Sequence, residues 1–236
     1  MTDLIYQTDS YVRAFDAVVA DVDAERHAVF LDCTAFYPGG GGQPNDEGWL
    51  SVNGQRLRVA KAERGNAHII EGGELPAIGE AVHGELDWER RYKLMRTHTA
   101  MHILCGVVWR DYGAQVTGGN MEPLAGRMDF EFERLQKELV AEIEARINAE
   151  VEAAHELRVR ILPRDEAFQI PDLIRTKINL LPEGISEVRT VEIIGLDLQA
   201  DGGTHVANTR EVGRLRIADY KSKGGINKRI YLELEG

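Results

Sequence analysis

The sequence predicts an α+β protein in which a small β-barrel precedes a two-layer α/β domain with a mainly antiparallel sheet. Three observations favour this class. Residues 10–86 consist of short apolar-alternating runs between turn signals, the pattern becomes helical from residue 87, and strands and helices then alternate towards the C-terminus. We therefore expect two domains, residues 1–86 and residues 87–236.

The first domain has the alternation of half-buried strands in five short runs, at residues 17–21, 28–32, 49–52, 57–60 and 68–70. Turn signals separate these runs. Asn53-Gly54 is typical of a type I′ hairpin, in which both central residues need positive φ. Gly65-Asn66 and Gly72-Gly73 mark further reversals. Such closely spaced strands predict a small barrel.

The second domain begins with a predicted helix that carries His98 and His102. A loop at residues 113–120 leads to an alternating strand at residues 127–132, and a long helix begins near Leu135. Eight glutamates between Glu131 and Glu156 give that helix a solvated acidic face. A short helix or loop is expected through residues 168–174. Further strands are predicted at residues 157–161, 187–194, 213–217 and 228–234.

The overall charge is acidic, with a net charge of -11 and a pI near 5.2. This argues against broad electrostatic capture of nucleic acid. Basic residues nevertheless gather in two segments, and each segment is either a solvated face or a local contact for phosphates. The residues are Arg90, Arg91, Lys93 and Arg96 in the first segment, and Arg214, Arg216, Lys221, Lys223, Lys228 and Arg229 in the second.

Several classes of function and location are disfavoured by what the sequence lacks. It contains no GxxxxGK[ST] phosphate loop, so ATP chemistry is not expected. No window approaches the roughly 18 apolar residues that a membrane span requires. Two cysteines, Cys33 and Cys105, allow at most one disulfide, and no secretory signal segment begins the chain. We expect a cytoplasmic protein.

A glycine-rich loop at residues 36–48 interrupts the predicted barrel. Its four successive glycines, Gly39 to Gly42, let the backbone approach a ligand closely or adopt dihedral angles that other residues avoid. Pro44 and Gly48 break the register where a nucleotide-binding GxGxxG turn would start its helix. A nucleotide cradle is therefore disfavoured, and a plain flexible loop is the alternative to a ligand-binding loop.

Two pairs of polar residues predict a metal site. His98 and His102 lie four residues apart, so a helix projects both imidazoles from one face. Asp201 and His205 repeat that offset downstream, and together the four side chains can complete a zinc site. Cys105 follows His98 by seven residues, a rise of about 10.5 Å along a helix. One ion cannot reach both residues, so Cys105 is expected in the core.

Three motifs follow one another along the chain: FYPGGGGQP at residues 36–44, HTAMH at residues 98–102 and GGTHV at residues 202–206. In these motifs the sequence resembles the alanyl-tRNA editing proteins, free-standing relatives of the editing domain of alanyl-tRNA synthetase, in their medium-length form with the barrel. The resemblance covers nearly the whole chain. It implies zinc bound by His98, His102 and His205, with Asp201 where the family has cysteine. Asp201 either ligates zinc through oxygen or orients a water or another ligand.

The activity that the resemblance implies is hydrolysis of the ester in mischarged alanine tRNA, with seryl-tRNA and glycyl-tRNA as substrates. A synthetase pocket for alanine cannot reject these amino acids sufficiently by size, so a second hydrolytic site is needed. Thr117 is our candidate for the contact with the serine hydroxyl. Gln43 and Gly39, Gly40, Gly41 and Gly42 are expected to close the pocket, with Arg96 as a further substrate contact. Backbone amides of Gly202 and Gly203 are candidates for stabilising the oxyanion.

Two other classes of function compete with this interpretation. One is a non-catalytic tRNA-binding or synthetase-associated module in which zinc only holds the fold. The other is a metallohydrolase of a small ester or amide. A peptidase is disfavoured, because HTAMH lacks the glutamate that acts as the base in HExxH.

Overall fold

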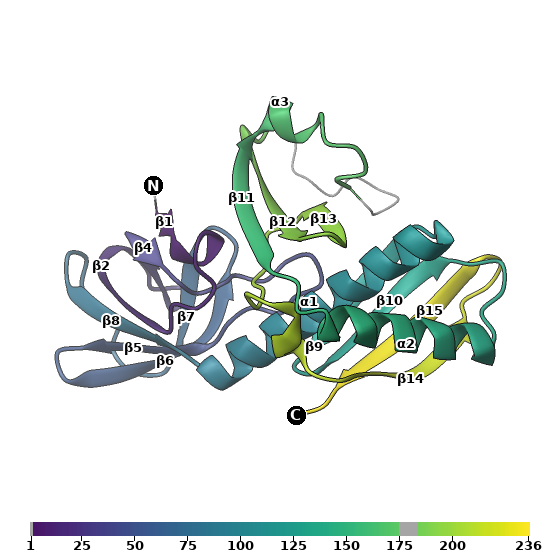
Figure 1. Cartoon of the computed structure of the whole chain (residues 1–236). Coiled ribbons are helices and arrows are strands. Elements are labelled where there is room, and N and C mark those ends of the chain that lie inside the picture. The colour runs from purple at the N-terminus through teal and green to yellow at the C-terminus, as the bar shows by residue number, and fades with distance from the viewer. Residues whose placement is uncertain (1, 175–183) are drawn as a thin grey trace. The chain divides into compact units, whose positions relative to one another are not determined.

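The computed structural model describes residues 2–174 and 184–236, and the chain forms two compact units, Met1–Lys93 and Leu94–Gly236. The division lies within helix α1, Trp88–Tyr112, a few residues beyond the boundary expected at residue 87. Figure 1 labels the elements of both units. Among the described residues, no helix has the length and apolar character needed to cross a membrane.

The first unit is a closed barrel of six antiparallel strands in the order β2-β3-β7-β6-β5-β8, which confirms the predicted barrel. Apolar side chains alternate inward along these strands and fill the interior with residues such as Leu31, Leu50 and Val59. The strands are β2 Ala14–Asp23, β3 Ala28–Leu31, β5 Gly48–Val52, β6 Gln55–Glu63, β7 Ala67–Glu71 and β8 Ala81–Leu86.

The hairpin between β5 and β6 has the predicted turn. Asn53 and Gly54 both have positive φ, 50° and 78°, as a type I′ turn requires. Outside the barrel, β1 Asp3–Leu4 pairs in parallel with β4 Cys33–Thr34, and the 3₁₀ helix η1 spans Ile5–Gln7.

The second unit contains a four-stranded antiparallel sheet in the order β14-β15-β10-β9. Helix α1 approaches this sheet closely at two glycines. A Cβ atom on Gly119 or Gly126 would lie 3.1 or 3.0 Å from the end of the Met101 side chain, so a larger residue would require Met101 to shift. The elements are β9 Val116–Glu122, β10 Ala125–Glu131, α2 Lys137–Glu152, β14 Leu215–Ser222 and β15 Asn227–Leu234.

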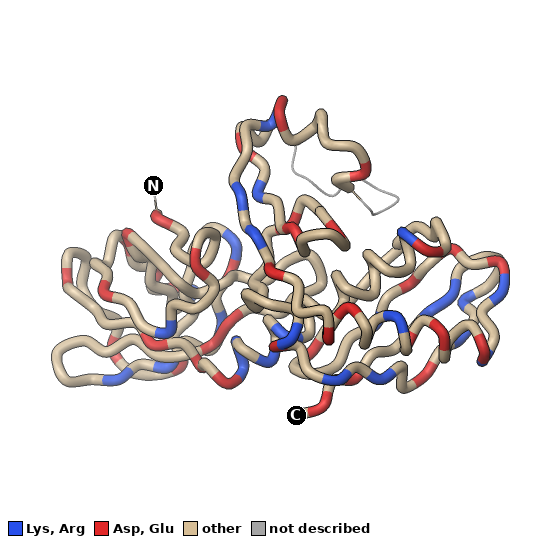
Figure 2. The backbone as a smooth tube through the Cα atoms, viewed as in Figure 1, with Lys and Arg blue, Asp and Glu red and all other residues tan. Residues whose placement is uncertain are grey.

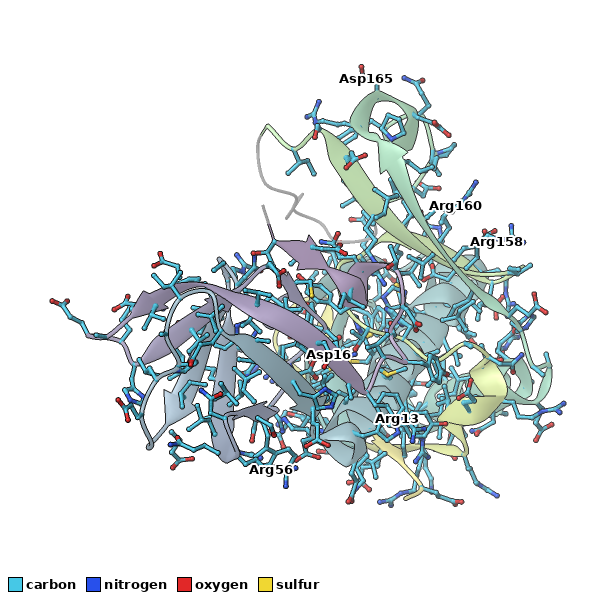
Figure 3. All side chains as sticks on the ribbon, turned by 90° about the vertical axis from the view of Figure 1, so that its left-hand side faces the viewer. Arg13, Asp16, Arg56, Arg158, Arg160 and Asp165 are labelled. Atoms are coloured by element: carbon cyan, nitrogen blue, oxygen red, sulfur yellow. The ribbon has the colours of Figure 1, made fainter. Side chains whose placement is uncertain are left out.

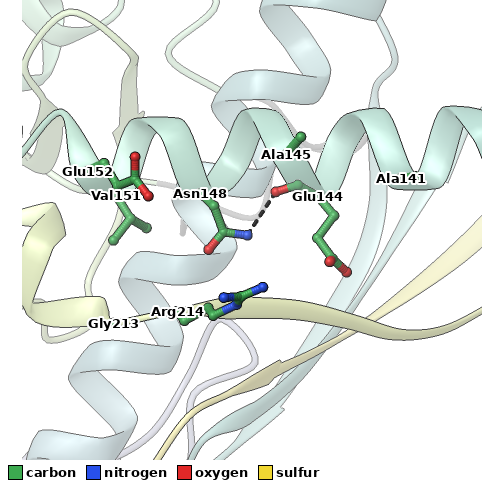
Figure 4. A pocket seen from close by; sticks show the side chains of 8 residues that line it. All are labelled: Ala141, Glu144, Ala145, Asn148, Val151, Glu152, Gly213 and Arg214. Carbon is green, nitrogen blue, oxygen red and sulfur yellow. Dashed lines mark hydrogen bonds between the residues drawn. The ribbon is translucent and has the colours of Figure 1, made fainter.

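Helix α2 covers the edge strand β14 with polar side chains. Asn148 exchanges two hydrogen bonds with the backbone of Leu215, and the Glu144 carboxylate accepts from the amide of Ile217. Figure 4 shows Asn148 facing the segment of Gly213 and Arg214, with its amide also bonded to the Glu144 carbonyl. These contacts satisfy backbone groups that an edge strand would otherwise expose.

A smaller antiparallel sheet in the second unit has the order β11-β12-β13. Leu162 and Val188 pack with Ala167 and Leu173 beneath it. This sheet leads into the segment at residues 201–205. Its elements are β11 Leu157–Pro163, α3 Arg164–Ala167, β12 Glu187–Ile193, β13 Asp197–Ala200 and the 3₁₀ helix η2 Thr209–Val212.

One local prediction is wrong. The loop predicted at residues 113–120 is largely strand β9, so Thr117 lies on a strand. Gly119, of a residue type that normally disfavours strands, lies in β9 where the side chain of Met101 on α1 packs against it. The short helix or loop predicted through residues 168–174 is confirmed as loop, and it follows the short helix α3 that ends at Ala167.

Candidate metal centre

Helix α1 places the imidazoles of His98 and His102 on one face, with ring centroids 5.1 Å apart. The third imidazole comes from the segment after β13. The ring of His205 lies 4.2 Å from that of His98 and 4.7 Å from that of His102. The four-residue offset in a helix and the turn after a strand therefore bring together three histidines from distant parts of the sequence.

The carboxylate of Asp201 completes the group. One ligand atom from each of His98, His102, Asp201 and His205 lies within 4.8 Å of all the others. Oxygens of Asp201 are 3.5 Å from His98 Nε2 and 3.0 Å from His205 Nε2. In a tetrahedral zinc site, donors about 2.0–2.2 Å from the ion lie only about 3.3 Å from one another. Three imidazoles and one carboxylate at this spacing fit a four-coordinate zinc ion.

Polar neighbours fix the orientation of two imidazoles. Nδ1 of His102 lies 3.2 Å from Asp197 Oδ2, which also accepts from the amide of Gln199 at 2.6 Å. Nδ1 of His205 lies 3.1 Å from the hydroxyl oxygen of Thr99. When Nδ1 is engaged in this way, Nε2 is the nitrogen left for an ion, and such partners hold the ring in place.

Burial sets the ionisation of the histidines. All three imidazoles are at least nine-tenths buried. Burial lowers the pKa of His98 well below its usual value and that of His205 to about 4, so both are neutral near pH 7. Neutral imidazole is the form that ligates a metal.

Asp201 keeps its charge although it is largely buried. Burial alone disfavours a carboxylate, but the facing His98 and the hydrogen bond with His205 hold the pKa of Asp201 well below its usual range. The amide of Gly203 also donates to Asp201 Oδ2 at 2.8 Å, and Arg189 donates to its carbonyl at 2.9 Å. These contacts therefore keep Asp201 in the charged form in which a carboxylate can bind a metal ion.

The other predicted site residues have varied surroundings. Thr117 is exposed on β9 and its hydroxyl donates to Asn227 Oδ1 at 3.0 Å. Arg96 donates to the backbone carbonyls of Val212 and Glu235, so its guanidinium holds the C-terminal segment. The amide of Gly203 is engaged by Asp201, while a Cβ on Gly202 would meet open space.

Gln43 and the glycines belong to the first unit. Gln43 is buried, and Gly39, Gly40, Gly41 and Gly42 all have positive φ. Cys105 is 2 % exposed and lies outside the metal-ligand group, and neither Cys33 nor Cys105, both among the described residues, forms a disulfide.

Sequence reasoning missed the residues that surround the ligands. Thr99 is inside the HTAMH motif but gives no signal of its own, because a threonine next to a histidine is common. Asp197 and Gln199 lie two residues apart on β13, a spacing that puts both on one face of a strand. From that spacing we could have predicted that Asp197 and Gln199 lie side by side, but not that Asp197 contacts His102.

Comparisons with known proteins agree with this fold and site. Residues 188–231 match the family model described as the threonyl and alanyl tRNA synthetase second additional domain, and residues 8–90 match tRNA synthetases class II (A). The alanyl-tRNA editing protein AlaX-M of Saccharolobus solfataricus is 39% identical over 236 residues, covering 98% of both chains. The AlaX-M protein of Methanosarcina acetivorans is 36% identical over 244 residues, covering 99% of both.

A longer relative is also similar. The alanine–tRNA ligase of Pyrobaculum neutrophilum is 38% identical over 223 residues, which cover 90% of this chain and 25% of the ligase. The chain is thus similar in sequence both to free-standing editing proteins and to one part of a tRNA synthetase. By its full-length similarity, the chain belongs to the family of alanyl-tRNA editing proteins of the AlaX-M type.

Proposed function

We propose that this protein is a trans-editing deacylase that hydrolyses the ester of mischarged alanine tRNA in the cytoplasm, with seryl-tRNA and glycyl-tRNA as its substrates. One observation carries the proposal. His98, His102, Asp201 and His205 form a buried ligand group in a chain that matches an alanyl-tRNA editing protein over 98% of its length. The same group supports metal dependence, with His98, His102, His205 and Asp201 as the residues that hold one zinc ion.

The chain's own residues prepare the site for an ester. When bound, zinc supplies Lewis acidity that polarises a carbonyl and makes water more acidic. Burial keeps His98 and His205 in the neutral form that ligates a metal, and Asp197 and Thr99 hold the rings of His102 and His205 in place. Open space at Gly202 leaves room for the substrate next to these ligands. We assign the backbone amide of Gly202 to the developing oxyanion, because the amide of Gly203, the other candidate, already donates to Asp201 Oδ2.

Selection of serine over alanine requires a polar group that alanine would leave unpaired. We propose Thr117 for this contact, because its hydroxyl is exposed on β9 and already takes part in a hydrogen bond with Asn227. We further propose that the glycine-rich loop and Gln43 contact the substrate, and that Arg96 supports the site by holding the C-terminal segment.

A deacylation assay tests the proposal. Zinc-loaded protein should release serine from seryl-tRNA of the alanine acceptor type and should leave alanyl-tRNA intact. His98→Ala should abolish hydrolysis while the circular dichroism spectrum stays native and tRNA still binds. His83→Ala is the matched control, since His83 is half exposed on the barrel and pairs with Asp16.

Each outcome of this assay decides between functions. Hydrolysis by His98→Ala at the wild-type rate would reject the metal centre as the catalytic site. Unfolding of His98→Ala, together with no hydrolysis by the wild type, would favour a tRNA-binding module in which zinc is structural.

A further inference from the structure

The glycine-rich loop is anchored at its base by one completely buried ion pair. Arg91, on the first turn of α1, is 0 % exposed and Asp46 is 1 % exposed. The Arg91 guanidinium contacts both carboxylate oxygens of Asp46, with Nε 2.9 Å from each. A charged pair with no access to water costs much desolvation, and only good geometry and further hydrogen bonds offset that cost.

Arg91 also binds two backbone carbonyls that precede the loop in the chain. Nη2 donates to the carbonyl of Ala35 at 2.6 Å, and Nη1 donates to the carbonyl of Ser10 at 3.0 Å. One guanidinium therefore joins three chain segments of the first unit. An apolar residue would fill the same space without these bonds, so stability alone does not explain a charge at this position.

Asp46 closes the loop on its other side. Its carboxylate accepts from the amide of Tyr37 at 2.7 Å, and its own amide donates to the carbonyl of Tyr37 at 2.9 Å. Residues 37–46 thus form a loop whose two ends are bonded to each other, and the Asp46 end is also bonded to Arg91. We call these residues the closed loop.

Hydrogen bonds also order the tip of the closed loop. Gly40 and Gln43 bond each other through both amides, at 3.0 and 2.8 Å, and the hydroxyl of Tyr37 donates to the carbonyl of Gly40 at 3.1 Å. The positive φ angles of Gly41 and Gly42, 58° and 91°, allow the tight turn between them. The alternative of a plain flexible loop does not agree with this bonding.

We infer that Arg91 is a positioning residue that, through Asp46, holds the closed loop in one preformed shape for binding the aminoacylated end of tRNA. The role in binding rests on the proposed function. A loop ordered before substrate arrives loses less conformational entropy on binding, so the ion pair acts on substrate affinity through geometry.

The decisive variant replaces the ion pair by apolar residues. Arg91→Met with Asp46→Leu removes both charges together, which is often neutral for stability, whereas either single change leaves a buried charge without its partner. We expect the double variant to fold and bind zinc like the wild type, yet to show faster amide hydrogen exchange at Gly40 and Gln43. Its KM for seryl-tRNA should rise about tenfold, with kcat changed far less, because the loss is in binding.

Two further variants complete the experiment. Asp46→Asn keeps the shape and an acceptor but leaves the buried Arg91 charge without its partner, so it should lower the stability of the first unit more than the double variant does. Arg56→Met is the control, because Arg56 forms an exposed pair with Glu85 on the same barrel (Figure 3). It should leave hydrogen exchange and KM unchanged.

The outcomes separate the inference from the proposed function. Faster exchange with a raised KM supports the inference, and wild-type KM in a folded double variant overturns the role in binding. Unchanged exchange at Gly40 and Gln43 overturns the positioning itself. If the wild type hydrolyses no aminoacyl-tRNA, the proposed function fails, and a tRNA affinity equal in wild type and double variant then overturns the inference as well.

Discussion

Asp201 is the residue at which this chain departs from the ligand set that its resemblance implies. Its carboxylate lies among three imidazoles and carries the only oxygen donor of the group. Thiolate is a softer ligand than carboxylate and suits zinc better. Asp201→Cys should therefore tighten zinc binding by about tenfold, or about 1.4 kcal/mol. Competition with a chromophoric chelator measures this, and equal or weaker affinity in the variant would count against Asp201 as a direct ligand.

Asp197 makes a different prediction, since it acts on the metal through His102. Removing the charge that accepts from His102 Nδ1 should loosen the ring and lower its basicity. Asp197→Asn should weaken zinc binding by about 10–100-fold. Asp219→Asn, an exposed acid on β14, is the control for the loss of one negative charge. Equal zinc affinity in the two variants would show that Asp197 does not support the site.

Buried His68 gives the barrel a pH dependence. Its Nε2 lies 2.8 Å from the Thr34 hydroxyl and its Nδ1 lies 3.0 Å from the Val29 carbonyl, so the neutral ring is fully bonded. Burial lowers the pKa of His68 to about 4, below the unfolded value near 6.5. The unfolded chain then binds the proton more readily. Stability is fully present above pH 6.5 and falls as the pH drops towards 4, by about 3 kcal/mol.

Urea unfolding of the barrel at several pH values checks this prediction. His68→Gln cannot take up the proton in this range, so its free energy of unfolding should vary less between pH 6.5 and 4 than that of the wild type. Parallel pH profiles for the two proteins would mean that His68 does not titrate on unfolding. The size of any constant offset between the variant and wild-type profiles reports the packing against Phe36 that the variant loses.

At the scale of elements, the predictions succeeded where local patterns and turns agreed. The barrel strands and the helix of His98 follow from period-two and helical spacing, and Asn53-Gly54 has the predicted turn. Strand β9 could not be predicted, because Gly118 and Gly119 are poor strand formers, and the contact between Gly119 and Met101 of α1 is tertiary. The histidine spacing predicted the group of His98, His102 and His205, whereas Asp197 and Thr99 meet their imidazoles only through tertiary contacts.

At the scale of the whole molecule, charge must be considered locally. The net charge of -11 repels nucleic acid, yet basic segments lie beside acidic ones at the β14–β15 end of the sheet (Figure 2). Several of these cations are already engaged within the protein. Arg229 pairs with Asp129, Arg216 with Glu233, and Lys228 donates to the carbonyl of Gly225. The turn that joins β14 to β15, together with its flanking residues, therefore offers fewer contacts for phosphates than its composition indicates.

Lys221 and Lys223 are the exposed cations of this turn, and Lys221 lies 4.7 Å from the centre of the Tyr231 ring. If both lysines contact tRNA phosphates, the logarithm of affinity should fall with the logarithm of salt concentration by a slope of about -1 to -2 from this turn. Above about 0.1 M salt the Debye length is below about 10 Å, so repulsion from distant acidic faces is screened and local contacts dominate.

Binding of uncharged alanine tRNA between 0.1 and 0.5 M salt measures this slope. The double variant Lys221→Ala with Lys223→Ala should lower the slope by about one to two, whereas Lys137→Ala at the start of α2 removes a charge elsewhere and should leave it unchanged. An unaltered slope in the double variant would exclude this turn from the tRNA contact.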